Sequence, residues 1–322
     1  MAGTGLLHAT QGGTRVETIL VAGVDTMVGA NISISLAGLQ PVVGIALKSE
    51  AAAPGLVEET CRSTSPEVIR RLVDRVAPDR IIYCGPGANC SWGNGTPQEA
   101  DFVQANAWFT ALADHPAPLT LISSDAVFTG PWMFHSENSE SLCPSREAGL
   151  LRDVESSAMA HRNDALTIRT HAFGWSPQNN GWLEQVLESL EEQQPLSLDC
   201  VRHASPILAT DLLAVLLKAW QSGLTGTYHI AGAERVNPVQ FARRLAHEFA
   251  LPFATMSQSE SLTDRATGYG RGETSLQTRK VRRALGMGLP LFSEGMERLY
   301  RQHLDGYRSR LQAEETVPRR VA

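Results

Sequence analysis

Short apolar runs alternate with helical segments along the first half of the chain, and this alternation most narrows the choice of fold. The runs are rich in Ile, Val and Leu, and they lie at residues 18–22, 41–47, 80–84, 119–123 and 165–169. Strands without a polar face are typical of a parallel sheet that helices cover on both faces. Helices of about ten residues are predicted between them. We therefore predict an α/β fold with a Rossmann-like, doubly wound parallel sheet.

Beyond about residue 175 the pattern changes and helices dominate. They are predicted over 181–193, 209–222, 237–250 and 279–286, with a short extended piece at 226–230. This pattern indicates a smaller, mainly helical lobe with a cleft between it and the sheet domain. The predicted organisation is a flexible leader (1–17), a Rossmann domain (18–175), a substrate-binding lobe interleaved with it (176–307) and a charged tail (308–322).

Composition and charge exclude several classes of protein. The 322 residues are 43% hydrophobic and 19% charged, with a net charge of −6, which argues against a nucleic-acid partner. The five cysteines form no CxxC pair, so neither a disulfide scaffold nor a metal site is expected. Asp211 and Lys218 interrupt the longest apolar stretch, and the first eighteen residues hold no signal-like apolar core. A cytoplasmic protein without a membrane partner is expected.

A glycine-bounded turn, GVDTMVG at residues 23–29, follows the first predicted strand and opens a helix. The N-terminus of a helix favours a pyrophosphate, and glycines allow the backbone to approach it closely. Thr26 stands where a full dinucleotide fingerprint has another glycine. The predicted cofactor-binding residues here are Gly23, Thr26, Met27, Val28 and Gly29. An ordinary strand-to-helix turn remains the alternative.

The residue after the second strand bears on the choice of cofactor. An acidic residue there would bind the ribose hydroxyls of NAD, but this chain has Lys48. A lysine at this place can meet the 2′-phosphate of NADP. NADP is therefore the expected cofactor. Because Lys48 can equally be an exposed loop lysine, NAD stays open.

Several segments in the same order resemble one known family. They are ILVAG at 19–23 with Gly29, PDRIIYCG at 78–85, ISSDAVFTG at 122–130, SP at 205–206, ATDL at 209–212, GTYHIAG at 226–232 and RKVRRALG at 279–286. Over about residues 18–300 the chain resembles the dTDP-4-dehydrorhamnose reductase family, also called RmlD-like. That family is a branch of the extended short-chain dehydrogenases/reductases. The resemblance implies an oxidoreductase that reduces the 4-keto group of a nucleotide sugar with NADPH or NADH, as in dTDP-rhamnose biosynthesis.

The family's chemistry rests on a Ser or Thr, a Tyr and a Lys, and the resemblance supplies only the first. Ser124 occupies the hydroxyl position. The segment PSREAGLLR at 144–152 aligns without a gap to the family's tyrosine and lysine positions, which hold Ala148 and Arg152 here. Alanine cannot donate a proton, whereas Arg152 can still hold a ribose or phosphate. The resemblance also implies that Cys84 and Gly85 border the cofactor.

Residues near these positions in the sequence could supply a replacement acid. Tyr83, His135, Glu137 and Glu147 are the candidates, of which His135 has the pKa best suited to proton transfer. A histidine on a surface loop is the preferred interpretation of His135.

The substrate site implied by the resemblance combines Ser124 and Asp125 with residues of the second lobe. Arg202 and His203 stand before Ser205 in place of the family's usual Asp-Gln-x-Gly, and they suit a diphosphate or sugar hydroxyls. Arg271, in GYGRG at 268–272, is a further candidate for phosphate contact.

Because the tyrosine and lysine are replaced, three functions stay open. The first is an NADP-linked reductase of a 4-keto nucleotide sugar. The second is a non-catalytic protein, a pseudoenzyme that binds NAD(P) or a nucleotide sugar and regulates a protein partner. The third is another reaction, such as epimerisation, on the same fold. A homodimer is not excluded by any of them.

Overall fold

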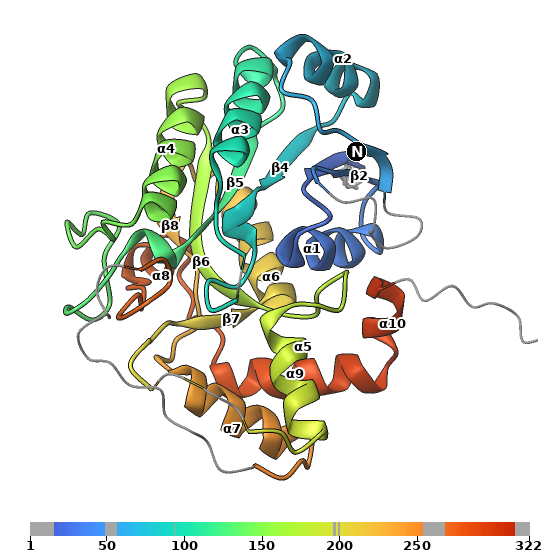
Figure 1. The fold of residues 1–322 in the computed structure, drawn as a ribbon. Coiled ribbons are helices and arrows are strands. Elements are labelled where there is room, and N and C mark those ends of the chain that lie inside the picture. The colour runs from blue at the N-terminus through green and yellow to red at the C-terminus, as the bar shows by residue number, and fades with distance from the viewer. Residues whose placement is uncertain are drawn as a thin grey trace, which may run out of the picture.

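A computed structural model describes residues 16–48, 57–93, 95–195, 198, 200–253 and 268–312. At its centre is an eight-stranded sheet in which every strand pair is parallel (Figure 1). The strand order is β3-β2-β1-β4-β5-β6-β7, and β8 also pairs with β6. The strands are β1 (Ile19–Ala22), β2 (Val42–Ala46), β3 (Val57–Thr60), β4 (Arg80–Cys84), β5 (Leu119–Ser124), β6 (Leu166–Phe173), β7 (Pro206–Leu208) and β8 (Gly226–His229).

Helices cover both faces of this sheet, which confirms the predicted doubly wound fold. On one face α1 (Met27–Ala37) and α6 (Ala209–Gln221) share an apolar cluster with the strands. On the other face lie α2 (Pro66–Val76), α3 (Glu99–Leu112) and α4 (Arg146–His161), with their own cluster. The apolar strands are therefore buried from both sides, as their lack of a polar face requires.

The direction of winding reverses beside β1. That strand lies between β2 and β4, and Ala22 is level with Ile45 and Tyr83. The carboxyl ends of the three strands thus open at the same edge. In such sheets the crevice at the point of reversal is the usual place for a ligand.

Four helices form a smaller lobe beyond this edge (Figure 1). They are α5 (Trp182–Glu191), α7 (Pro238–Glu248), α9 (Phe292–Leu304) and α10 (Tyr307–Gln312). An apolar cluster rich in aromatic rings holds them together, with Phe241 packed against Trp182, Phe173 and Phe292. The remaining helix, α8 (Arg279–Leu285), packs beside β8.

Local side-chain contacts determine where two of the helices begin. The α1 helix begins at Met27 because Thr26 caps it, and α3 begins at Glu99 because Gln98 and Asp101 form a capping box. The sequence pattern gave no bounds for β3, α4, α9 or α10. The chain is helical to Gln312, inside the predicted tail, and the rest of that tail and most of the leader lie outside the described residues.

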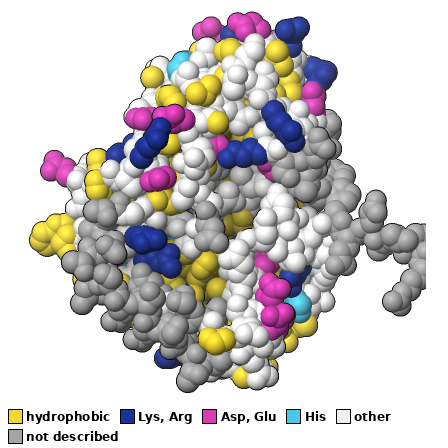
Figure 2. Space-filling model, in the orientation of Figure 1, with side chains coloured by type: hydrophobic (Ala, Val, Ile, Leu, Met, Phe, Trp, Pro, Cys, Tyr) yellow, Lys and Arg dark blue, Asp and Glu magenta, His cyan; other side chains and the backbone are white. Residues whose placement is uncertain are grey.

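Charged side chains of both signs are interspersed on the face seen in Figure 2. Among the described residues no helix is both long and apolar enough to span a bilayer.

Candidate cofactor and catalytic site

The turn between β1 and α1 is built by backbone geometry. Gly23 has a φ of +95°, and a Cβ atom there would lie 1.9 Å from the carbonyl oxygen of Cys84. The Thr26 hydroxyl donates to the Gly23 oxygen (2.7 Å) and accepts from the Gly29 N–H (3.1 Å). Thr26 therefore closes the turn and caps α1. It stands at a position that is glycine in the full fingerprint, and its side chain makes these contacts.

The first N–H of α1 already has a partner. The Met27 N–H donates to the side-chain oxygen of Asn89 (3.0 Å), while Val28 and Gly29 are buried in the first turn. An anion that approaches this helix end must replace the Asn89 oxygen. Asn89 was not predicted as a site residue, because it lies past the strand that carries the family motif.

Asp25 is a second residue that the sequence pattern missed. Its carboxylate accepts from the backbone N–H groups of Leu47 (2.9 Å) and Lys48 (2.8 Å), so the turn after β1 holds the end of β2. The carboxylate thus fixes the position of Lys48 relative to the crevice.

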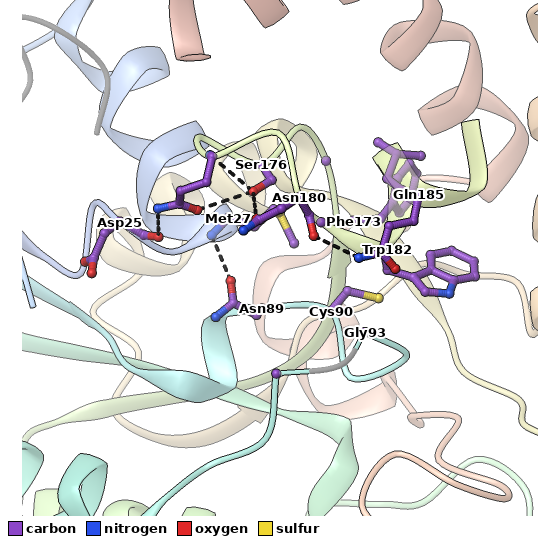
Figure 3. A pocket seen from close by; sticks show the side chains of 15 residues that line it. Asp25, Met27, Asn89, Cys90, Gly93, Phe173, Ser176, Asn180, Trp182 and Gln185 are labelled. Atoms are coloured by element: carbon purple, nitrogen blue, oxygen red, sulfur yellow. Dashed lines mark hydrogen bonds between the residues drawn. The ribbon is translucent and has the colours of Figure 1, made fainter. Parts of the chain in front are cut away.

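Two adjoining cavities follow the edge of the sheet. The smaller, of about 230 Å³, is lined by Thr26, Lys48, Cys84 and Gly85 among others. The larger, of about 510 Å³, extends over Met27 to α5, as Figure 3 shows. Both are lined by Asp25, Asn89 and Gly95. A trough that passes over the N-terminus of a helix has the shape that an extended dinucleotide needs.

Lys48 stands at the smaller cavity with its ammonium group paired to the buried carboxylate of Asp101. The lysine side chain is 59% exposed. It can therefore turn toward a bound phosphate, but it must share its charge with Asp101.

Ser124 ends β5 and is buried. Its hydroxyl donates to Asp125 Oδ1 (3.1 Å) and accepts from the Ala126 N–H (3.2 Å). The Asp125 carboxylate also accepts from Ser91 Oγ (3.0 Å) and Thr274 Oγ1 (2.5 Å). The Ser124 hydroxyl thus belongs to a network of buried hydrogen bonds, and its catalytic role remains a prediction.

The two positions that depart from the family pattern both lie on α4. Ala148 is fully buried in its first turn. The Arg152 guanidinium donates from Nη1 to the backbone oxygen of Cys143 (2.8 Å). Arg152 therefore has a partner in the chain itself, and its predicted contact with a cofactor remains a prediction.

A tyrosine from a distant segment of the chain reaches the same place. The phenol of Tyr269 lies beside Ser124, and its ring packs against the apolar cluster that includes Val127, Phe128 and Leu151. Burial raises the pKa of Tyr269, and the neighbouring Ser124 hydroxyl opposes this only in part. The phenol is accordingly protonated at neutral pH.

Tyr269 was not predicted as a site residue, because it is remote from the aligned motif in the sequence. The one local signal is its position between two glycines. Gly270 has a φ of +63°, and a Cβ atom there would lie 2.3 Å from the Ser91 oxygen, so the turn that presents the tyrosine depends on glycine.

His135 does not lie on the surface, and its interpretation as a surface-loop histidine was wrong. It is buried, its ring is stacked on Phe128, and its Nε2 lies 3.1 Å from the Glu273 oxygen. Burial lowers the pKa of His135, so the neutral ring is favoured. Tyr83 is also buried, between Trp108 and Phe109.

The predicted substrate residues of the second lobe lie on two adjoining segments. The His203 N–H donates to the Gly272 oxygen (2.9 Å), and the His203 oxygen accepts from the Thr274 N–H (2.8 Å). The imidazole Nδ1 of His203 lies 2.7 Å from the Val201 oxygen. Arg202 is half-buried beside it, and Arg271 is exposed. Through Thr274 these segments reach Asp125.

No cluster of three or more potential metal ligands occurs in the part of the chain that the structure describes.

Sequence comparisons find relatives of this chain. Residues 17–304 match the family model described as the RmlD substrate binding domain. A probable low-salt glycan biosynthesis reductase, Agl14 of Haloferax volcanii, is 24% identical over 245 residues, which cover 73% of this chain and 81% of that protein.

Solved structures share the fold at low identity. The dTDP-4-dehydrorhamnose reductase of Bacillus anthracis, in complex with NADP, has a TM-score of 0.75 and 17% identity, covering 89% of this chain and 99% of that one. The dTDP-glucose 4,6-dehydratase of the same organism, in complex with NAD, has a TM-score of 0.72 and 11% identity, covering 90% and 97%. Proteins with different reactions thus share the architecture, and the reaction must be argued from the site.

Proposed function

The chain belongs to the RmlD substrate binding domain family, and we propose that it is a cytoplasmic, NADP-linked reductase of a 4-keto nucleotide sugar. The family match and the reductase relative support this reaction class. The observation that carries the proposal is the position of the Tyr269 phenol beside Ser124. This phenol can supply the proton donor that the aligned position, Ala148, lacks.

In this proposal Ser124 and Tyr269 act on the ketone oxygen. The Ser124 hydroxyl would polarise the carbonyl, and the Tyr269 hydroxyl would give its proton to the oxygen as negative charge develops there. NADPH, when bound, supplies the hydride to the carbonyl carbon. Asp125 would hold the Ser124 hydroxyl in position through their hydrogen bond. Because no lysine assists the phenol, we expect slow turnover.

The residues of the trough fit a dinucleotide. Gly23, Thr26 and Gly29 would bring the backbone close to the pyrophosphate, and Cys84 and Gly85 would border the cofactor at the end of β4. Lys48 would meet the 2′-phosphate of NADP. The nucleotide sugar would extend toward His203 and Arg271, with Arg202 nearby.

A second candidate function is a non-catalytic nucleotide-sugar or NAD(P)-binding protein that acts on a protein partner or in a homodimer. Two observations favour it. Arg152 is bonded to the chain's own backbone, and Ser124 is only 1% exposed, so a ketone cannot reach its hydroxyl unless neighbouring side chains move.

The test is to measure NADPH oxidation with a dTDP-linked 4-keto-6-deoxy sugar for the wild type and Tyr269→Phe. Loss of a general acid costs about 10²- to 10⁴-fold in rate, so the variant should lose nearly all activity while it binds NADPH as tightly as before. Tyr300→Phe is the matched control. Tyr300 lies on α9 and packs against Phe249, so loss of its hydroxyl should not affect the rate.

An unchanged rate in Tyr269→Phe would remove this tyrosine from the mechanism. Wild-type protein that binds the nucleotide sugar but never oxidises NADPH would favour the second function instead.

A further inference from the structure

Cys90 lies beside an imidazole that no part of the proposed reduction uses. Its Sγ atom is 3.7 Å from Nε2 of His171, a residue of β6. The other ring nitrogen of His171, Nδ1, is 2.9 Å from Asp125 Oδ2. The order of groups is thiol, imidazole and carboxylate, which is the arrangement that activates cysteine nucleophiles in enzymes of unrelated folds.

The imidazole of His171 is held in one orientation. Its side chain is fully buried, its ring packs against Trp92 with centroids 4.4 Å apart, and Ser91 Oγ lies 3.1 Å from Nδ1. Since Asp125 faces Nδ1, a proton on that nitrogen is fixed there and Nε2 faces the sulfur.

Charge around His171 favours its protonated form. Burial alone would lower the pKa of His171, but the carboxylate of Asp125 and the sulfur of Cys90 together raise it to about 10. The phenol of Tyr269 is a further titratable group near Cys90. An imidazolium next to a thiol stabilises the thiolate, which is the nucleophilic form.

Cys90 is accessible from a cavity, whereas its partner His171 is fully buried. Cys90 is half-buried and lines the cavity of about 510 Å³. Figure 3 shows Cys90 on one wall of this cavity, with Asn180 and Gln185 on the wall that faces it. Cys61, Cys84 and Cys143 are buried, and Cys200 is the other half-buried cysteine.

We propose that Cys90, with His171 and Asp125, is a nucleophilic thiol site that adds reversibly to the carbonyl carbon of a small aldehyde in the large cavity. A carbonyl compound suits both Cys90 and His171. The thiolate can attack its carbon, while the proton on His171 Nε2 lies next to the oxygen that becomes negative. The sulfur lone pair forms the C–S bond, and the C=O π electrons move to oxygen. The oxygen takes the proton from Nε2, so the product is a neutral thiohemiacetal and no oxidant is needed. The site does not depend on the proposed reductase activity.

The experiment is alkylation of the intact folded protein with iodoacetamide, followed by peptide mapping of each cysteine between pH 6 and pH 8. Cys200 serves as the internal reference. The rate of an ordinary thiol falls about a hundredfold over these two pH units, because its thiolate fraction falls tenfold per unit. We expect the Cys90 rate to change less than fivefold and to exceed that of Cys200 at least tenfold at pH 6.

Two further arms test the imidazole and the ligand. His171→Gln should slow labelling of Cys90 at least tenfold at pH 6 and leave the rate of Cys200 unchanged. Millimolar propanal should slow labelling of Cys90 in the wild type, and the rate should recover when propanal is removed.

If the alkylation rates of Cys90 and Cys200 changed with pH in parallel, the proposal would be overturned. This comparison uses the wild-type protein alone, so it does not depend on the folding of a variant. Equal Cys90 rates in the wild type and a folded His171→Gln variant would overturn the role of the imidazole. Fast labelling that propanal does not slow would overturn carbonyl addition.

Discussion

The carboxyl ends of β1 and β5 lie on the same edge of the sheet but are built in opposite ways. The end of β1 is a turn shaped by backbone, with Gly23 against Cys84, and it opens into the trough. The end of β5 is closed, because Ser124 and Asp125 are buried under side chains from other segments, Tyr269 and Thr274 among them. Local spacing therefore determines the first region, whereas contacts between distant segments determine the second.

The largest expected effect is at the backbone-built turn. Gly23→Ala would place a Cβ atom 1.9 Å from the Cys84 oxygen in a residue with a φ of +95°. Strain and overpacking together should cost roughly 3–5 kcal/mol of unfolding free energy and abolish NADPH binding. Urea unfolding and a fluorescence titration with NADPH measure both.

Gly38→Ala is the control, since a Cβ there would meet only the Ser35 oxygen, at 3.9 Å. If Gly23→Ala were as stable as Gly38→Ala, the backbone of this turn would not be what shapes the crevice.

The contrast between the two regions also explains which site residues could be predicted from the sequence. Gly23 follows β1 directly, Gly29 lies in the first turn of the helix after it, and Ser124 ends β5, so the position of each could be inferred from the strand beside it. Tyr269 and His171 could not be found in this way. Their functional contacts, with Ser124 and Cys90, join segments far apart in the chain, and no single-segment pattern reports such contacts.

The closed region should make the protein sensitive to acid. His229 ends β8 and packs against Phe128, and burial, aided by the charge of Arg169, lowers its pKa to about 3. As the pH falls below about 6.5, His229 binds a proton in the unfolded chain but stays neutral in the folded protein, so folding stability is lost. The loss should be about 2 kcal/mol between pH 6.5 and pH 5.

Urea unfolding at the two pH values tests this for the wild type and His229→Phe, which should lose markedly less stability over the same interval. His247→Gln is the control, because the His247 side chain is 75% exposed. Equal losses in all three proteins would assign the acid sensitivity to other groups.

A smaller effect tests whether Thr26 takes over a glycine position by capping. Thr26→Val removes the hydroxyl that caps α1 and should cost about 1 kcal/mol, whereas Thr26→Gly should cost only a few tenths. Thermal unfolding of the two variants measures the difference. Equal losses in both would mean that the hydroxyl adds nothing that glycine does not supply.

The smallest expected effect concerns the choice of cofactor at the open end of the trough. Lys48 is exposed and already paired to Asp101, and an exposed ion pair contributes about 1 kcal/mol at most. Lys48→Ala should therefore raise the Kd of NADPH about two- to fivefold and leave that of NADH unchanged. Lys218→Ala, at an exposed lysine on α6, is the control. Both constants come from fluorescence titrations at low and high salt, because a phosphate contact weakens with ionic strength. An equal change for NADH and NADPH would show that Lys48 does not read the 2′-phosphate, and specificity would then have to arise elsewhere in the trough.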